Sequence, residues 1–215
     1  MHMQTTQQRQ RRIGRRFLEG VESNARLTGT LAAVLLVLLA AEGITILRIR
    51  QLINLHVFIG MLLLPPVLLK IGTTTWRFLR YYAGSPAYRR KGPPVTILRL
   101  LGPVVVVLTV ILLGSGVGVI AAPSSMRNIL LQLHRASFVL WFGAMAIHVL
   151  GHLKETRHLA PLDYMNRTRR QIRGAGARTW SVAVTLVLGV ILGIVTYGHN
   201  GGFAIYGLHH VGFGH

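Results

Sequence analysis

The chain has 215 residues, of which 51% are hydrophobic and only 13% charged, and 24 Lys and Arg stand against 5 Asp and Glu. A soluble domain carries about 25% charged residues, so this composition cannot cover a globular core with a polar surface. Cysteine is absent, which excludes disulfides, thiolate metal sites, iron–sulfur clusters, thiol catalysis and thioether-linked haem. A membrane protein with basic loops and a very basic nucleic-acid-binding protein remain.

Long apolar stretches decide between these two classes. Five of them are about 18 to 28 residues long, and a helix needs roughly 20 apolar residues to cross the hydrocarbon core of a bilayer. A buried helix of a soluble protein would keep a polar stripe, which these stretches lack. The sequence therefore predicts an all-α membrane protein with spans at residues 27–47, 52–71, 95–122, 129–150 and 180–197.

Basic residues set the expected orientation of these spans. They are concentrated in segment 1–26 and in the loops after the second and fourth spans, and loops rich in Lys and Arg stay in the cytoplasm. We therefore expect a multi-pass protein of the bacterial inner membrane with a cytoplasmic amino terminus. The Gln- and Arg-rich start of the arm, 1–16, is expected to be disordered on lipid headgroups. Basic loops beside spans are ordinary topology signals, so membrane lipid is the expected partner and nucleic acid is not.

Three histidines fall within the spans of the membrane domain, 27–198. His56 and His134 each lie about four residues inside the expected outer boundary, on two helices that run in the same direction, so they share one depth. Two neutral imidazoles facing each other suit the two axial positions of haem iron. His148 lies 14 residues after His134, about four helical turns further along the same side. The residue 14 positions after His56 is Lys70.

The segments around these histidines, 55–60, 75–78 and 133–138, followed by His148 and His152, resemble bacterial membrane cytochrome b proteins. The similar groups are the cytochrome b561 type and the b subunits of hydrogenases and molybdo-oxidoreductases. The resemblance implies a four-helix haem-binding bundle, here with a fifth transmembrane helix. It implies bis-histidine haem b and electron transfer between the quinone pool and a partner oxidoreductase. Lys70 stands where a di-haem member has a histidine, so one haem is expected, with His148 marking the place of a second.

Each of three residues near the histidine pair has two possible roles. Gly60, one turn from His56, either lets a flat macrocycle approach the helix or allows close packing of two helices. Arg135 pairs with haem propionates or is ordinary surface basicity. Glu42, the only acid within a span, relays a proton at a quinol site or forms an ion pair with Arg48.

Three functions stay open from the sequence. The leading one is an electron-transfer subunit of an oxidoreductase, with His56 and His134 as iron ligands. An intramembrane histidine pair is also a plain interhelical hydrogen-bonding device, as in a cofactor-free anchor or assembly subunit that docks a partner or anionic lipid. The third is metal handling by the Gly- and His-rich external tail, 199–215, with His199, His209, His210 and His215. A homo-oligomer is compatible with each.

Overall fold

The chain folds into long helices, as its apolar spans predict. The computed structural model describes residues 2–91, 96–163, 165, 167 and 173–199, and every regular element within those ranges is a helix. Five of the helices are long and apolar enough to cross a membrane, which confirms the all-α membrane class. The elements are α1 (His2–Leu47), α2 (Ile49–Tyr82), α3 (Pro86–Lys91), α4 (Thr96–Ala121), α5 (Ser124–Leu159), η1 (Ala160–Asp163) and α7 (Ala175–His199).

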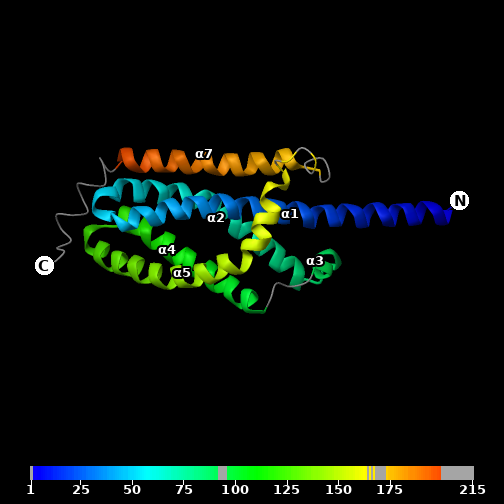
Figure 1. Ribbon diagram of the computed structural model, residues 1–215, viewed down its shortest axis with the longest axis horizontal. Helices are drawn as coiled ribbons and strands as arrows, with labels where there is room; N and C mark the ends of the chain where they lie inside the picture. Colours follow the sequence, from blue (N-terminus) through cyan, green and yellow to red (C-terminus); the bar gives the residue numbers. More distant parts are fainter. Residues whose placement is uncertain (1, 92–95, 164, 166, 168–172, 200–215) are drawn as a thin grey trace.

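The long helices lie side by side in an elongated bundle (Figure 1). The helices α1 and α2 run through the middle, the α4–α5 hairpin packs on one side of them and α7 lies along the other. We call the end with the α1–α2 and α4–α5 turns the hairpin end. The opposite end, where α1 projects beyond the other helices, is the arm end.

The amino-terminal arm is helical, which differs from the disorder expected of its first 16 residues. Helix α1 continues without a break from His2 through the first span to Leu47. Gln and Arg are good helix formers, and a helix already nucleated by the span extends at low free-energy cost. The arm and the first span are therefore one element.

Side-chain burial matches a bundle that faces lipid. A small buried cluster formed by Leu35, Ile59, Leu63 and Val67 joins α1 to α2. Many large apolar side chains on the outside of the spans are exposed, including Val37 at 70% and Val139 at 69%. Such an apolar exterior is stable only against hydrocarbon.

Helix α7 packs against α2 through two glycines one turn apart. A Cβ atom on Gly189 would lie 2.4 Å from the backbone oxygen of Leu62, and one on Gly193 would lie 2.7 Å from the ring of Phe58. Pro66 has no N–H, so the Leu62 carbonyl lacks its usual partner within α2. Gly189 has no side chain and lets the backbone of α7 come close to this carbonyl, and close contacts of that type recur where helices meet at small residues.

A buried ion-pair cluster closes the arm end. Asp163, 3% exposed, accepts hydrogen bonds from Arg178, at the start of α7, and from Arg26 in α1, which lie at 2.6 and 3.4 Å. Arg178 also donates to the Ser23 hydroxyl at 2.8 Å. We call Arg26, Asp163 and Arg178 the clasp. It ties the segment after α5 to both α1 and α7.

Candidate functional site

The two histidines singled out from the sequence meet between α2 and α5, near the hairpin end. The ring centres of His56 and His134 lie 6.3 Å apart, and the ring planes are inclined by 76°. The side chain of His56 is 19% exposed, and His134 is half-buried. The structure thus brings together two imidazoles that are 78 positions apart in the chain.

Helix α1 supplies the partners of His56. The Nδ1 atom of His56 lies 3.0 Å from Oε1 of Glu42 and 3.0 Å from Oγ1 of Thr45. The Thr45 hydroxyl donates its own proton to the Glu42 carbonyl at 2.6 Å. Glu42 therefore binds His56 rather than forming the alternative ion pair with Arg48.

Helix α4 supplies the partners of His134. The Nδ1 atom of His134 lies 3.0 Å from the Leu112 backbone oxygen and 3.4 Å from the Ser115 hydroxyl. A Cβ atom on Gly116 would lie only 3.0 Å from Cε1 of the ring. The ring therefore occupies a notch that exists because residue 116 has no side chain.

These contacts determine which ring nitrogens are free to bind a metal. A carbonyl oxygen only accepts hydrogen bonds, so Nδ1 of His134 must carry the proton it shares with Leu112. The Glu42 carboxylate imposes the same tautomer on His56. In a neutral imidazole the other nitrogen, Nε2, then has its lone pair available. Metal-ligating histidines generally have this second contact to a carbonyl or a carboxylate.

The spacing of the rings also fits axial ligation. Two imidazoles on opposite faces of one metal ion, with about 2 Å for each metal–nitrogen bond and about 1 Å from nitrogen to ring centre, have centres about 6 Å apart. The observed 6.3 Å agrees with this separation. Among the described residues, no group of three or more His, Cys, Asp or Glu is placed to hold a metal ion. A haem needs only two ligands from the protein, because the porphyrin supplies four.

Gly60 lies beside this site but faces α1. A Cβ atom on Gly60 would be 3.6 Å from Oε1 of Glu42, the oxygen that binds His56. This glycine therefore leaves room for the Glu42 side chain against α2. Its contact favours the helix-packing reading over direct approach to a macrocycle.

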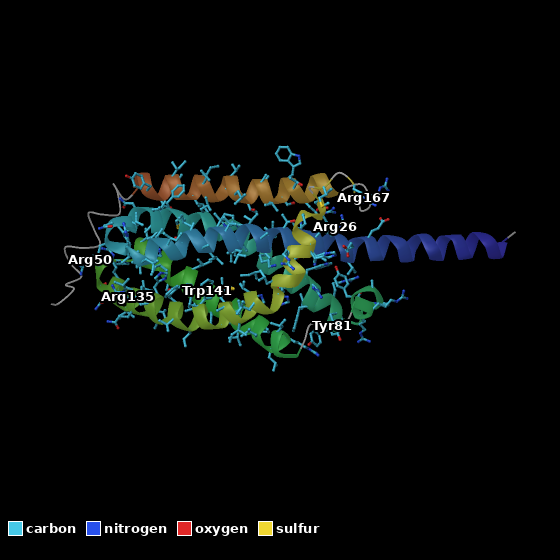
Figure 2. All side chains as sticks on the ribbon, viewed as in Figure 1. Arg26, Arg50, Tyr81, Arg135, Trp141 and Arg167 are labelled. Carbon is cyan, nitrogen blue, oxygen red and sulfur yellow. The ribbon has the colours of Figure 1, made fainter. Side chains whose placement is uncertain are left out.

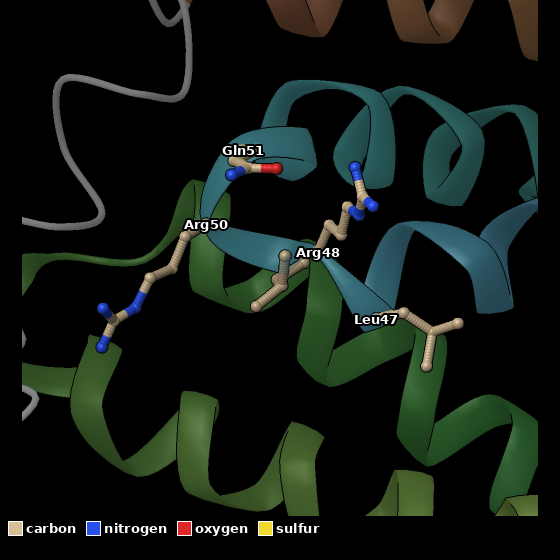
Figure 3. Close-up of a pocket in the computed structure, with 5 residues that line it drawn as sticks. Leu47, Arg48, Arg50 and Gln51 are labelled. Carbon is tan, nitrogen blue, oxygen red and sulfur yellow. The ribbon is translucent and has the colours of Figure 1, made fainter.

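Arginines gather at the hairpin end, where Arg135 and Arg50 are both exposed (Figure 2). The α1–α2 turn forms an open pocket of about 600 Å³, and Arg48 and Arg50 leave it in different directions (Figure 3). Neither His56 nor His134 is among its lining residues, which are Leu47, Arg48, Ile49, Arg50 and Gln51. The pocket is thus a surface feature near the histidine pair.

A second polar group lies closer to the arm end. The rings of His148 and His152 have centres 4.8 Å apart, and Nδ1 of His148 is buried without a hydrogen-bond partner. Lys70 is close enough to His148 to interact with it electrostatically, and its Nζ donates to the Thr28 carbonyl at 2.7 Å. Lys70 is therefore anchored on α1. Among the described residues, no histidine of another helix faces His148 in the way that His56 faces His134.

Sequence reasoning did not find the acceptors of the two rings. Glu42 precedes the turn residue Arg48 by six positions and His56 follows it by eight, so folding the hairpin about Arg48 would have paired them. The role of the Leu112 carbonyl has no signal in the sequence, because every residue has such an oxygen. The tail histidines His209, His210 and His215 lie outside the described residues, as does the side chain of His199.

No protein-family model, no curated protein and no solved structure matches this chain.

Proposed function

We propose that this protein is an integral membrane b-type cytochrome that transfers electrons between the quinone pool and a partner oxidoreductase. The observation that carries the proposal is the His56–His134 pair, in which each Nδ1 is bound to an oxygen acceptor and the ring centres are 6.3 Å apart. Because each Nδ1 is bound to an acceptor on α1 or α4, Nε2 of each neutral ring keeps its lone pair for a metal ion.

The residues of the chain have separate tasks in this proposal. His56 and His134 would hold one haem b through Nε2, and Glu42 and the Leu112 carbonyl fix the orientation of the two rings. Bound haem supplies one-electron chemistry at a potential that the ligands and their hydrogen bonds adjust. Arg135 would bind a haem propionate, because a guanidinium binds a carboxylate through two parallel hydrogen bonds.

The site also suggests where electrons enter or leave. The pair lies near the starts of α2 and α5 and therefore near the hairpin end, and the basic loops at the arm end favour a cytoplasmic amino terminus in a bacterial inner membrane. A haem at this depth is nearest to a partner on the external side. We place a second, weaker site at His148, because no histidine of another described helix lies opposite it.

The test is the reduced-minus-oxidised optical spectrum of the protein purified from cells supplied with haem precursor, with haem counted as its pyridine complex. We expect one haem b per chain with the sharp bands of a low-spin iron. His56→Ala and His134→Ala should each lose most of the bound haem. His158→Ala is the matched control, because His158 is exposed beyond the fourth span.

A colourless wild-type protein that is monodisperse in detergent would overturn the proposal and favour an anchor or assembly subunit. Two haems per chain would instead assign His148 a ligand role. Haem retained in both alanine variants would place the cofactor elsewhere in the protein.

A further inference from the structure

A cluster of arginine and aromatic side chains lies at the arm end, away from the histidine pair. It contains Trp76, Arg80, Tyr81 and Tyr82 from the end of α2 and Arg99 from the first turns of α4, and we call it the Arg–aromatic patch. The Nε atom of Arg99 donates to the Tyr82 hydroxyl at 2.6 Å. The guanidinium of Arg99 lies 5.1 Å from the Tyr82 ring centre and 5.9 Å from that of Tyr81. Arg80 lies 5.6 Å from the ring centre of Trp76.

These contacts hold each of the two guanidinium groups against an aromatic ring, which carries no opposite charge. The sequence has no Asp or Glu between Glu42 and Glu155. In the part of the chain that the structure describes, neither Arg80 nor Arg99 forms an ion pair. Nε of Arg99 is bound to Tyr82, and the N–H groups of the two Nη atoms of Arg99 can donate to an external acceptor.

The position of the patch favours a lipid as the source of that acceptor. Arg99 is the second residue of the span Leu98–Ala121, so it lies where hydrocarbon gives way to headgroups. The apolar residues Trp76 and Leu79, one helical turn apart on α2, are 55% and 57% exposed. Trp and Tyr prefer this interface, and a charge at the edge of hydrocarbon is costly unless an opposite charge lies nearby.

We propose that the Arg–aromatic patch binds the phosphate of an anionic phospholipid headgroup. The Nη groups of Arg99 bind the phosphate oxygens through the forked donors of the guanidinium. Arg80, at the same end of α2, adds a second positive charge near the headgroup. The exposed faces of Trp76 and Leu79 contact the upper part of the acyl chains. This inference does not depend on haem binding.

The experiment measures the binding of phosphatidylglycerol and phosphatidylcholine to the full chain in detergent, by native mass spectrometry and by thermal shift. We expect phosphatidylglycerol to bind at least about tenfold more tightly to the wild type, and Arg80→Gln/Arg99→Gln to lose this preference. The control variant Arg89→Gln/Arg90→Gln removes two positive charges from exposed positions on α3. This control should keep the preference for phosphatidylglycerol. Inorganic phosphate should give no shift.

Tyr82→Phe provides a second variant that leaves the charge unchanged and removes only the hydroxyl that holds Arg99. It should weaken phosphatidylglycerol binding severalfold, and it remains informative where the double variant does not fold. Equal losses in the patch and control variants would overturn the proposal in favour of general electrostatic attraction. An undiminished preference in both patch variants, or an equal shift with inorganic phosphate, would also overturn it.

Discussion

The two imidazoles of the candidate site differ in the acceptor that each one contacts. His56 shares its Nδ1 proton with the carboxylate of Glu42, whereas His134 shares its own with the neutral carbonyl of Leu112. A carboxylate makes an imidazole a more basic ligand than a carbonyl does, and a basic ligand stabilises the oxidised state of iron. The two axial ligands of the proposed haem would thus be electronically unequal.

Glu42→Gln tests this inequality and rests on the proposed function. The amide preserves an oxygen acceptor for Nδ1 of His56 but removes the negative charge. We expect haem content to stay near that of the wild type and the midpoint potential to rise by roughly tens of millivolts. A redox titration followed at the haem bands measures this rise. An unchanged potential in a fully loaded variant would contradict the role of Glu42 while leaving the haem proposal intact.

Gly116 and Gly114 form a matched pair for testing the notch that holds His134. A side chain at 116 meets the His134 ring, whereas a Cβ atom on Gly114 has nothing within 4 Å. Gly116→Val should therefore displace the ring and lower haem content several-fold, and Gly114→Val should leave haem content unchanged. Haem per chain, measured after size-exclusion chromatography, gives the comparison. Equal haem content in the two variants would show that the notch does not position His134.

At the scale of elements, the contact of α7 with α2 is the one least tolerant of added volume. A methyl group at Gly189 meets backbone atoms of Leu62 that cannot turn aside, the nearest at 2.4 Å. We expect Gly189→Ala to destabilise the bundle by about 1–3 kcal/mol, the usual cost of overpacking. Gly176→Ala is the control on the same helix, because its Cβ atom would have nothing within 4 Å.

Thermal unfolding in detergent compares the two variants, and the midpoint should fall for Gly189→Ala alone. An unshifted midpoint would mean that α7 can move away from α2 without cost. Loss of stability in both variants would instead indicate a general effect of alanine on α7.

The positions of the helices in the sequence could be predicted better than the contacts between the helices. All five spans follow from apolar length, and the equal depth of His56 and His134 follows from counting residues inward from the turns. The placement of α7 did not follow, because it depends on which faces of α2 and α7 are small enough to meet at Gly189 and Gly193. The helical arm was not predicted, because the composition of residues 1–16 indicates disorder. Composition takes no account of the neighbouring span, which has already nucleated the helix.

At the scale of the whole molecule, the clasp joins three segments distant in sequence. Burial raises the pKa of Asp163, but the hydrogen bonds and charges of Arg178 and Arg26 outweigh burial and hold this pKa below its ordinary value of 3.8. A carboxyl group with a lowered pKa in the folded state stabilises the fold above the ordinary value. This stabilisation is lost as the pH falls below 3.8 through the lowered pKa of the folded state.

Asp163→Asn should therefore lower the free energy of unfolding at pH 7 by about 3 kcal/mol, because it removes the carboxylate that pairs with the buried Arg178 guanidinium. Arg26 keeps its contact with Glu22 at 3.5 Å. The difference in melting temperature between wild type and variant should shrink as the pH falls below 3.8. Glu19→Gln, which removes an acid outside the clasp, is the control at each pH. A difference that stays constant from pH 7 to pH 3 would contradict an electrostatic role for Asp163.

The second of the two adjacent prolines in α2 has a consequence for the order in which the molecule is completed. Pro66 cannot donate to the Leu62 carbonyl, and Gly189 of the last span lies against that oxygen. Synthesis proceeds from the amino terminus, so the first four spans exist before Gly189 has been made. The second span therefore lacks this contact until the ribosome has produced the fifth, and insertion of α7 is the step that completes it.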